Sequence, residues 1–165
     1  MTFGPLDTQR CFRGLLGAMS RPGTVHNVQP GLPLVLATLV DHEVRLAEVG
    51  EPGWPAADFV LVRGGDSGGD VTRARQGTLL DPALGATAIY EVAAVGEGPL
   101  TLSLSGPGVG PAPRTLHLTG VPAAEVALWR STRSSFPLGV DVLLVDRAGR
   151  CAALPRSTAL STVEG

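Results

Sequence analysis

The chain reads VDVLLVDRAGRCAAL from residue 140 to residue 154, and this stretch decides the fold. Residues 140–145 are almost continuously apolar, which predicts a buried strand. Residues 147–150 form a tight turn, and Cys151–Leu154 return as a second apolar segment, so the two segments can pair as a hairpin. Another continuous apolar run, Phe59–Val62, predicts a further buried strand.

Helical patterns flank these strands. A first helix is expected from about Asp7 to Ser20, capped by Asp7 or Thr8 and ended by the Arg21-Pro22 step. Its apolar residues recur on one face at helical spacing: Cys11, Phe12, Leu15, Leu16 and Met19. A second helix is expected over residues 31–40 and a third over residues 122–133, with Val126, Leu128 and Trp129 on its apolar side.

Shorter segments fill the middle of the chain. Strands are expected over residues 25–28, 44–49, 86–95, 100–105 and 115–119, and a short helix over residues 71–76. Helices around a mostly strand-bearing middle predict an α/β fold, with α+β as the open alternative. We expect residues 1–165 to form a single domain with a mixed β-sheet flanked by helices.

The composition excludes several classes of function. All 13 basic residues are arginine, so the chain has no lysine for a Schiff base with pyridoxal phosphate or for a phosphate-binding P-loop. We therefore expect no cofactor. The arginines are scattered and the net charge is −2, which does not support nucleic-acid binding. Only 17% of the residues are charged, which favours a surface partly covered by a partner.

Targeting and redox signals are absent from the sequence. The longest apolar stretch, Leu32–Val40, is far shorter than the roughly 20 residues that cross a bilayer. The two cysteines, Cys11 and Cys151, are widely separated and match no metal motif. We expect a cytoplasmic protein with reduced thiols, a single long-range disulfide being the alternative, and no association with membranes.

The stretch Gly65-Asp66-Ser67-Gly68-Gly69 matches the G-x-S-x-G pattern that presents a nucleophilic serine. A hydrolase would also need a histidine bonded to Ser67 and a carboxylate that orients it. Only His117 follows the serine, on a predicted strand. We therefore favour a Gly-rich surface loop over a serine hydrolase.

Other candidate motifs are weaker. The three histidines are too dispersed for a metal site, and Asp66 and Asp70 lack the regular ligand spacing of a calcium loop. Gly106-Pro107-Gly108 could direct backbone N–H groups at an anion, but Pro107 removes one donor and a sheet-edge turn explains every residue. We expect no metal.

Four segments, in order along the chain, resemble the PhnH family, the H subunit of bacterial carbon–phosphorus (C–P) lyase. They are FRGLLGAMSRPG (residues 12–23), GAT (85–87), LSGPG (104–108), and FPLGVD (136–141) leading into ALPRST (153–158). The resemblance covers almost the whole chain, which is shorter than the family pattern after the first helix and in the tail.

The resemblance implies a fold like that of pyridoxal-phosphate-dependent transferases, reduced to one domain and lacking the cofactor. It also implies a subunit of the complex that couples a phosphonate to the ribose of ATP, after which an iron–sulfur radical subunit breaks the C–P bond. The family assigns no catalytic residue to this subunit, so a structural or assisting role is expected. Its partners would be the other C–P lyase subunits, with a homodimer in isolation.

Four residues in the matching segments are candidates for binding. Arg21 and Arg156 could bind phosphate or phosphonate oxygens bidentately, which would make the chain a small phosphonate-binding module. They could equally contact a partner subunit or pair with Asp141, which precedes an apolar run and is expected to need an arginine partner. Phe136 and Asp141 are therefore the partner or ion-pair candidates.

Overall fold

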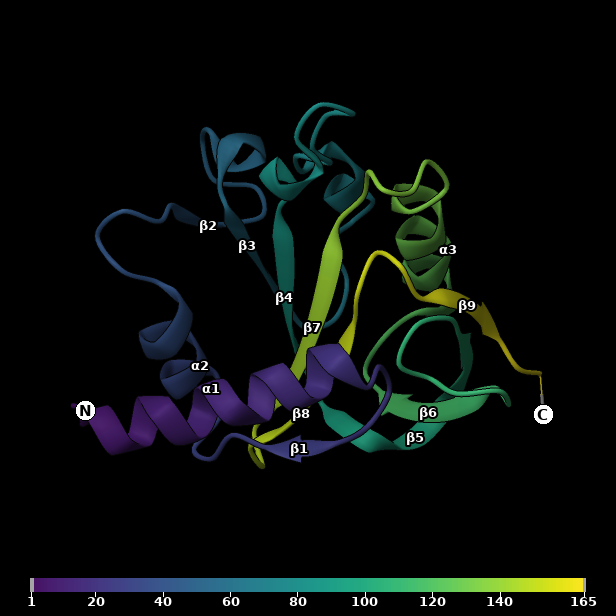
Figure 1. The fold of residues 1–165 in the computed structure, drawn as a ribbon, viewed down its shortest axis with the longest axis horizontal. Coiled ribbons are helices and arrows are strands. Elements are labelled where there is room, and N and C mark those ends of the chain that lie inside the picture. Colours follow the sequence, from purple (N-terminus) through teal and green to yellow (C-terminus); the bar gives the residue numbers. More distant parts are fainter. Residues whose placement is uncertain (1, 165) are drawn as a thin grey trace.

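The computed structural model describes residues 2–164 and centres on a six-stranded mixed sheet (Figure 1). Four strands run parallel: β2 (Leu46–Glu48), β3 (Phe59–Arg63), β4 (Thr87–Val92) and β7 (Asp141–Asp146). The predicted hairpin is confirmed, because β8 (Arg150–Leu154) pairs antiparallel with β7, and β1 (His26–Asn27) adds to its other edge. The strand order is β1-β8-β7-β4-β3-β2.

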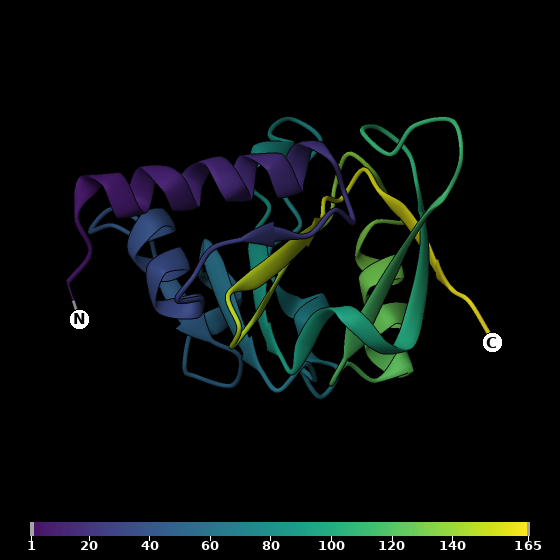
Figure 2. The same cartoon turned by 90° about the horizontal axis from the view of Figure 1, so that it is seen from below.

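Both faces of this sheet are buried, because successive side chains of a strand point to opposite faces. One face packs against α1 (Pro5–Ser20) and α2 (Leu32–Leu39) through Leu61, Ile89, Leu143, Val145 and Ala153. The opposite face packs against α3 (Ala123–Thr132) and the second sheet through Val60, Val62, Tyr90, Val142 and Leu144. Figure 2 shows α1 and α2 on one side of the sheet and α3 on the other.

The first helix differs from its prediction in two details. Its N-cap is Gly4, whose N–H donates to the Asp7 carboxylate at 2.9 Å, so Asp7 sits in the first turn and is not the cap residue. Cys11, Leu15 and Ala18 are buried, whereas Phe12 and Leu16 are about half exposed. The buried stripe is therefore rotated away from the face that the sequence predicts.

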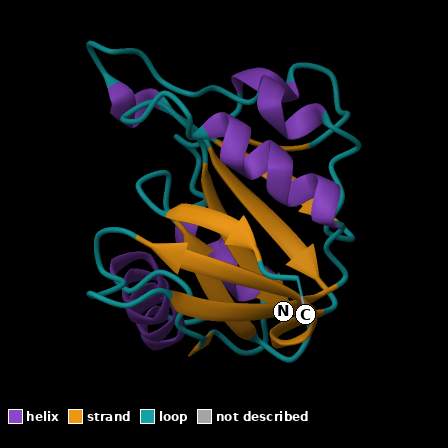
Figure 3. Ribbon diagram, turned by 90° about the vertical axis from the view of Figure 1, so that its right-hand side faces the viewer, coloured by secondary structure: helices purple, strands orange, loops and turns teal. Residues whose placement is uncertain are grey.

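A second, three-stranded antiparallel sheet corrects the expectation of a single sheet. It contains β5 (Ala94–Ser105), β6 (Arg114–Thr119) and β9 (Ala159–Thr162), in the order β6-β5-β9. The first half of β5 shifts register between Val95 and Leu100, where Gly96 and Gly98 take positive φ. Figure 3 shows these strands crossing in front of the larger sheet.

Short 3-10 helices complete the connections: η1 (Trp54–Ala56), η2 (Asp70–Arg73) and η3 (Pro82–Leu84). The helix predicted over residues 71–76 is thus a single 3-10 turn, and strand β9 has no counterpart among the predictions. Among residues 2–164, no helix is both long and apolar enough to cross a membrane.

Candidate functional site

Ser67 is buried rather than presented at the surface, with 7% of its area exposed. Its Oγ donates to the Glu125 carboxylate and lies 2.7 Å from each carboxylate oxygen, while its backbone N–H donates to the same group at 3.1 Å. The three histidines lie elsewhere: His26 bonds Thr24, His117 bonds Thr101, and the exposed His42 lies beside Glu43. A nucleophilic serine needs an imidazole to accept its proton. The structure therefore does not support the hydrolase alternative.

The glycines around Ser67 are explained by the path of the backbone. Gly64, Gly65, Gly68 and Gly69 all take positive φ, which side chains with a Cβ rarely adopt. At Gly65 a Cβ would also overlap the backbone carbonyl of Gly120. The match to a hydrolase motif thus arises from two consecutive tight turns.

Glu125 is the centre of a buried hydrogen-bond network. It is 1% exposed, and its carboxylate also accepts the Tyr90 hydroxyl at 2.8 Å. Burial, and secondarily the charge of Glu125, raises the pKa of Tyr90 above its ordinary value. No ion pair among residues 2–164 includes Glu125. Its three donors are neutral, so the network fixes the loop before η2, strand β4 and helix α3 to one another and leaves no reactive group exposed.

Acidic side chains do not assemble a metal site in the described part of the chain. No group of three His, Cys, Asp or Glu side chains there is placed to hold a metal ion. Asp66 accepts the N–H of Gly68 within its own loop at 2.8 Å. Its role there is to shape the turn.

A cleft of about 400 Å3 opens beside the C-terminal end of α3 and the turn between β8 and β9. Three arginines line this arginine cleft: Arg130, Arg133 and Arg156. The remaining lining residues are Phe136, Ser157, Thr158, Ala159 and Leu160.

Arg133 is buried in the wall of this cleft, and no carboxylate among residues 2–164 forms an ion pair with it. Its Nη1 donates to the carbonyl of Trp129 at 3.0 Å, and its Nη2 to the carbonyl of Leu154 at 2.8 Å. Burial lowers the pKa of Arg133 to about 10, so the group stays protonated at neutral pH. Its Nε is buried and has no hydrogen-bond partner in the described part of the chain.

Arg156 and Asp141 form a bidentate ion pair at the edge of the same cleft. The Arg156 Nε lies 3.2 Å from Oδ1 of Asp141, and its Nη2 lies 3.1 Å from Oδ2. Its Nη1 donates to the carbonyl of Pro82 at 2.7 Å. Phe136 is 59% exposed and lines both the arginine cleft and a neighbouring cleft that contains Asp141. Three of the four predicted residues thus lie together.

The fourth residue, Arg21, lies apart from them. It is exposed at the C-terminal end of α1 and does not line the arginine cleft. Its backbone carbonyl accepts the hydroxyl of Thr24 at 2.6 Å. The structure therefore does not place Arg21 and Arg156 in one binding site.

The Gly106-Pro107-Gly108 segment packs against the end of α1. A Cβ at Gly108 would meet the carbonyl of Ser20, and the Arg114 guanidinium donates to the carbonyls of Pro22 and Val109. The segment is a turn held against its neighbours, as turn chemistry predicts.

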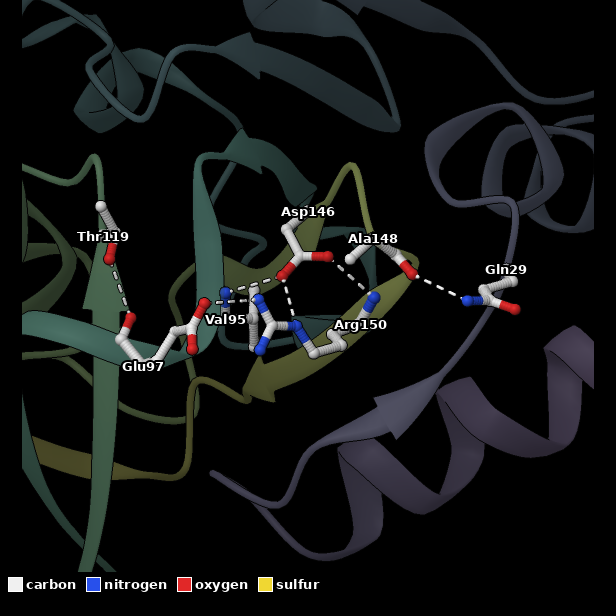
Figure 4. Close-up of polar contacts among 7 residues, drawn as sticks. All are labelled: Gln29, Val95, Glu97, Thr119, Asp146, Ala148 and Arg150. Carbon is white, nitrogen blue, oxygen red and sulfur yellow. Dashed lines mark hydrogen bonds and ion pairs between the residues drawn. The ribbon is translucent and has the colours of Figure 1, made fainter.

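Asp146 joins the two sheets at the carboxyl end of β7. Its buried carboxylate accepts the N–H of Val95 and the backbone and side-chain N–H groups of Arg150, each at 2.9 Å. Arg150 also pairs with Glu97 of β5 at 3.2 Å (Figure 4). The cluster therefore ties β5 to the β7–β8 hairpin.

Sequence reasoning missed Arg130, Arg133 and Thr158. The first two are three residues apart on a helix, a spacing that places side chains on neighbouring positions of one face. That spacing was the available signal for the first two. No sequence spacing points to Thr158, because its place in the cleft depends on β8 belonging to the larger sheet and β9 to the second sheet.

A model of bacterial phosphonate metabolism protein PhnH matches residues 4–53 and 52–161 of the chain. The chain belongs to the PhnH family. A relative from Stutzerimonas stutzeri, "Putative C-P lyase subunit protein HtxG", is 36% identical over 91% of this chain and 84% of its own length. The Rhizobium meliloti protein "Alpha-D-ribose 1-methylphosphonate 5-triphosphate synthase subunit PhnH" is 28% identical over 93% of this chain and 90% of its own length.

Membership of the PhnH family confirms the resemblance drawn from the four segments. The matched regions contain every residue of the arginine cleft. They also contain Ser67 and Glu125, which form a structural network in this PhnH-family chain.

Proposed function

We propose that this chain is a subunit of a C–P lyase assembly that processes phosphonates, and that it completes the assembly without an active site of its own. Two relatives that align over most of its length are named as subunits, one of C–P lyase and one of a ribose phosphonate triphosphate synthase. The one serine with a nucleophile motif, Ser67, has its proton committed to Glu125.

The observation that carries this proposal is an exposed apolar patch, here called the amino-edge patch. It consists of Leu79, Leu80, Leu84 and Phe136, whose exposed fractions are 79%, 100%, 50% and 59%. The two loops that carry it lie side by side, because Pro82, Ala83, Phe136 and Pro137 line one cleft. Large apolar side chains exposed together indicate a protein interaction surface.

The patch sits where the parallel strands begin. Thr87 of β4 and Asp141 of β7 are register partners, so the loops that precede them emerge at the same edge of the sheet. The Arg156–Asp141 ion pair and the bond from Arg156 to Pro82 hold the base of both loops. A rigid base beneath exposed leucines suits a surface that docks against another subunit.

The proposal extends to the origin of the fold. We infer that it corresponds to a pyridoxal-phosphate-dependent transferase fold reduced to one domain. The run of parallel strands with helices on both faces supports this inference, as does a sequence with no lysine to form the Schiff base.

Co-expression with the other C–P lyase subunits of the same organism tests the assembly role. A tag on this chain is expected to bring the partners through affinity and size-exclusion chromatography as one complex. Leu80→Glu and Phe136→Glu should each abolish co-elution, because a charge replaces an exposed apolar contact. Leu6→Glu is the matched control, since Leu6 is 80% exposed but lies on α1.

The outcomes separate the alternatives. Partners that assemble while the wild-type chain elutes alone would refute the assembly role. Loss of co-elution in Leu6→Glu but not in the patch variants would move the interface to α1. The chain on its own is expected to form a homodimer through the same patch, which light scattering detects and Leu80→Glu should convert to a monomer.

A further inference from the structure

We propose that the arginine cleft binds the oxyanion head of an organic phosphate or phosphonate. The site comprises Arg130 and Arg133 of the α3 end, with Thr158 and the paired Arg156 opposite. The proposal concerns a ligand of the isolated chain, so it stands independently of any partner subunit.

Uncompensated positive charge is the first argument. Arg156 is neutralised by Asp141, but neither Arg130 nor Arg133 forms an ion pair with any residue in the range 2–164. Arg133 is only 9% exposed, and charged side chains are almost never that buried unless paired. Burial lowers the pKa of Arg133 most, the nearby charge of Asp141 raises it in part, and the charge of Arg156 lowers it further. An anion in the cleft would relieve the effects of burial and of Arg156.

Unused hydrogen-bond donors in the cleft wall are the second argument. The Thr158 hydroxyl and the Arg133 Nε are both buried and have no hydrogen-bond partner among residues 2–164. Thr158 is 1% exposed, yet it lines the cleft. Buried polar groups are nearly always hydrogen-bonded, and two orphaned donors in one small cleft are unusual. A tetrahedral oxyanion offers the several acceptor oxygens that these donors lack.

The apolar wall of the cleft defines the rest of the ligand. Phe136, Ala159 and Leu160 line the same space as the arginines. A volume of about 400 Å3 lies within the usual range for small-molecule sites, roughly 300–1,000 Å3. The cleft therefore suits a phosphoryl or phosphonyl head joined to a small organic group better than it suits a bare inorganic ion.

Calorimetric titration of the full chain tests the proposal. The probes are methylphosphonate, ATP, inorganic phosphate and, as an oxyanion without phosphorus, acetate. Arg130→Ala removes an exposed guanidinium, and Thr158→Val removes only the hydroxyl at nearly constant shape, so both variants should fold. Arg13→Ala is the matched control, because Arg13 is an exposed arginine on α1 outside the cleft.

The expected result is saturable binding of methylphosphonate or ATP with a 1:1 stoichiometry. Arg130→Ala should raise the Kd about tenfold and Thr158→Val about fivefold, whereas Arg13→Ala should leave it unchanged. Preference for methylphosphonate over ATP would assign the head group to a phosphonate, and the reverse preference to a phosphate ester.

Three results would overturn the proposal: no heat with any phosphorus probe, acetate binding as tightly as methylphosphonate, or equal weakening by Arg13→Ala. None of these involves the co-elution experiment. Neither Arg130→Ala nor Thr158→Val alters the amino-edge patch, so the cleft can fail while the assembly role survives.

Discussion

Replacing Glu125 tests how much its buried hydrogen-bond network, which engages Ser67, contributes to the stability of the fold. Glu125→Ala removes the acceptor of three hydrogen bonds, from the Ser67 backbone, the Ser67 hydroxyl and the Tyr90 hydroxyl. The Ser67 hydroxyl can rotate toward another acceptor. The Ser67 N–H and the Tyr90 O–H are fixed by the backbone and by a fully buried ring.

The magnitude follows from those two stranded donors. Each buried donor left unsatisfied costs about 1–3 kcal/mol, so the pair destabilises the fold by about 4 kcal/mol. That is a large part of the total stability of an ordinary domain, about 5–15 kcal/mol. Glu125→Gln keeps one acceptor oxygen, which can serve either the Ser67 N–H or the Tyr90 O–H but not both, because these donors bind different oxygens of the carboxylate. One donor is therefore stranded instead of two, and we expect a cost of about 2 kcal/mol.

Urea unfolding followed by tryptophan fluorescence measures the difference, because Trp129 packs edge-on against Tyr90 with ring centroids 5.2 Å apart. A loss below about 1 kcal/mol in Glu125→Ala would refute the role given to these hydrogen bonds. A Gln variant as unstable as the Ala variant would show that the charge of Glu125, and not its acceptor oxygens, holds the network together.

Three further predictions follow from buried groups. Tyr90 is the only tyrosine, and its pKa is raised in the folded state. The free energy of unfolding should therefore be intact below about pH 10 and fall as pH rises further, by about 1.4 kcal/mol per pH unit. Absorbance titration should show the late ionisation, and Tyr90→Phe should reduce the slope of stability against pH. Burial raises the pKa of Cys151 to about 12 and also raises that of Cys11, so a thiol reagent at pH 8 should modify neither cysteine until denaturant is added. Asp146→Ala strands the buried N–H of Val95 and should lower the unfolding free energy by about 2 kcal/mol, measured by urea titration.

The strands of the larger sheet could be predicted because their signal is local. Residues 59–62 and 142–145 are largely buried on both faces, so each is apolar without interruption and stands out in the sequence. Strand β9 gives no such signal, since only Leu160 of its four residues is buried. The division into two sheets depends on pairing between distant segments, which no local pattern encodes.

The exposed face of α1 shows a second limit of periodicity. Phe12 and Leu16 share a broad apolar stripe with Leu15, and the sequence does not say which part of the stripe meets the core. The structure decides this through small residues, because a Cβ at Gly17 would overlap the His26 ring and Gly14 lies close to Val28. Close approach at the glycines turns Cys11 and Leu15 inward and leaves Phe12 outside.

The residues of the candidate site also differ in whether they could be predicted from the sequence. Asp141 and Arg156 could be associated from the sequence, because a carboxylate beside an apolar run needs a cation nearby. The buried position of Arg133 could not be predicted from the sequence. Its guanidinium is held by the carbonyls of Leu154 and Pro155, which belong to a strand and a turn far along the chain. A constellation built across two sheets is visible only once both are assembled.

The placement of these features along the sheet links the fold to the proposed role. Open α/β sheets ordinarily bind ligands beyond the carboxyl ends of their strands. Here the second sheet covers that end of β7, where Asp146 accepts the N–H of Val95 from β5. A cleft beside β4 is lined by Glu91, but this carboxylate already forms an ion pair with Arg63. The amino-edge patch and the ion pair of Asp141 lie instead at the opposite ends of the strands, where Asp141 is the first residue of β7. The surface proposed for docking therefore lies at the end of the sheet opposite the one where open α/β sheets bind their ligands.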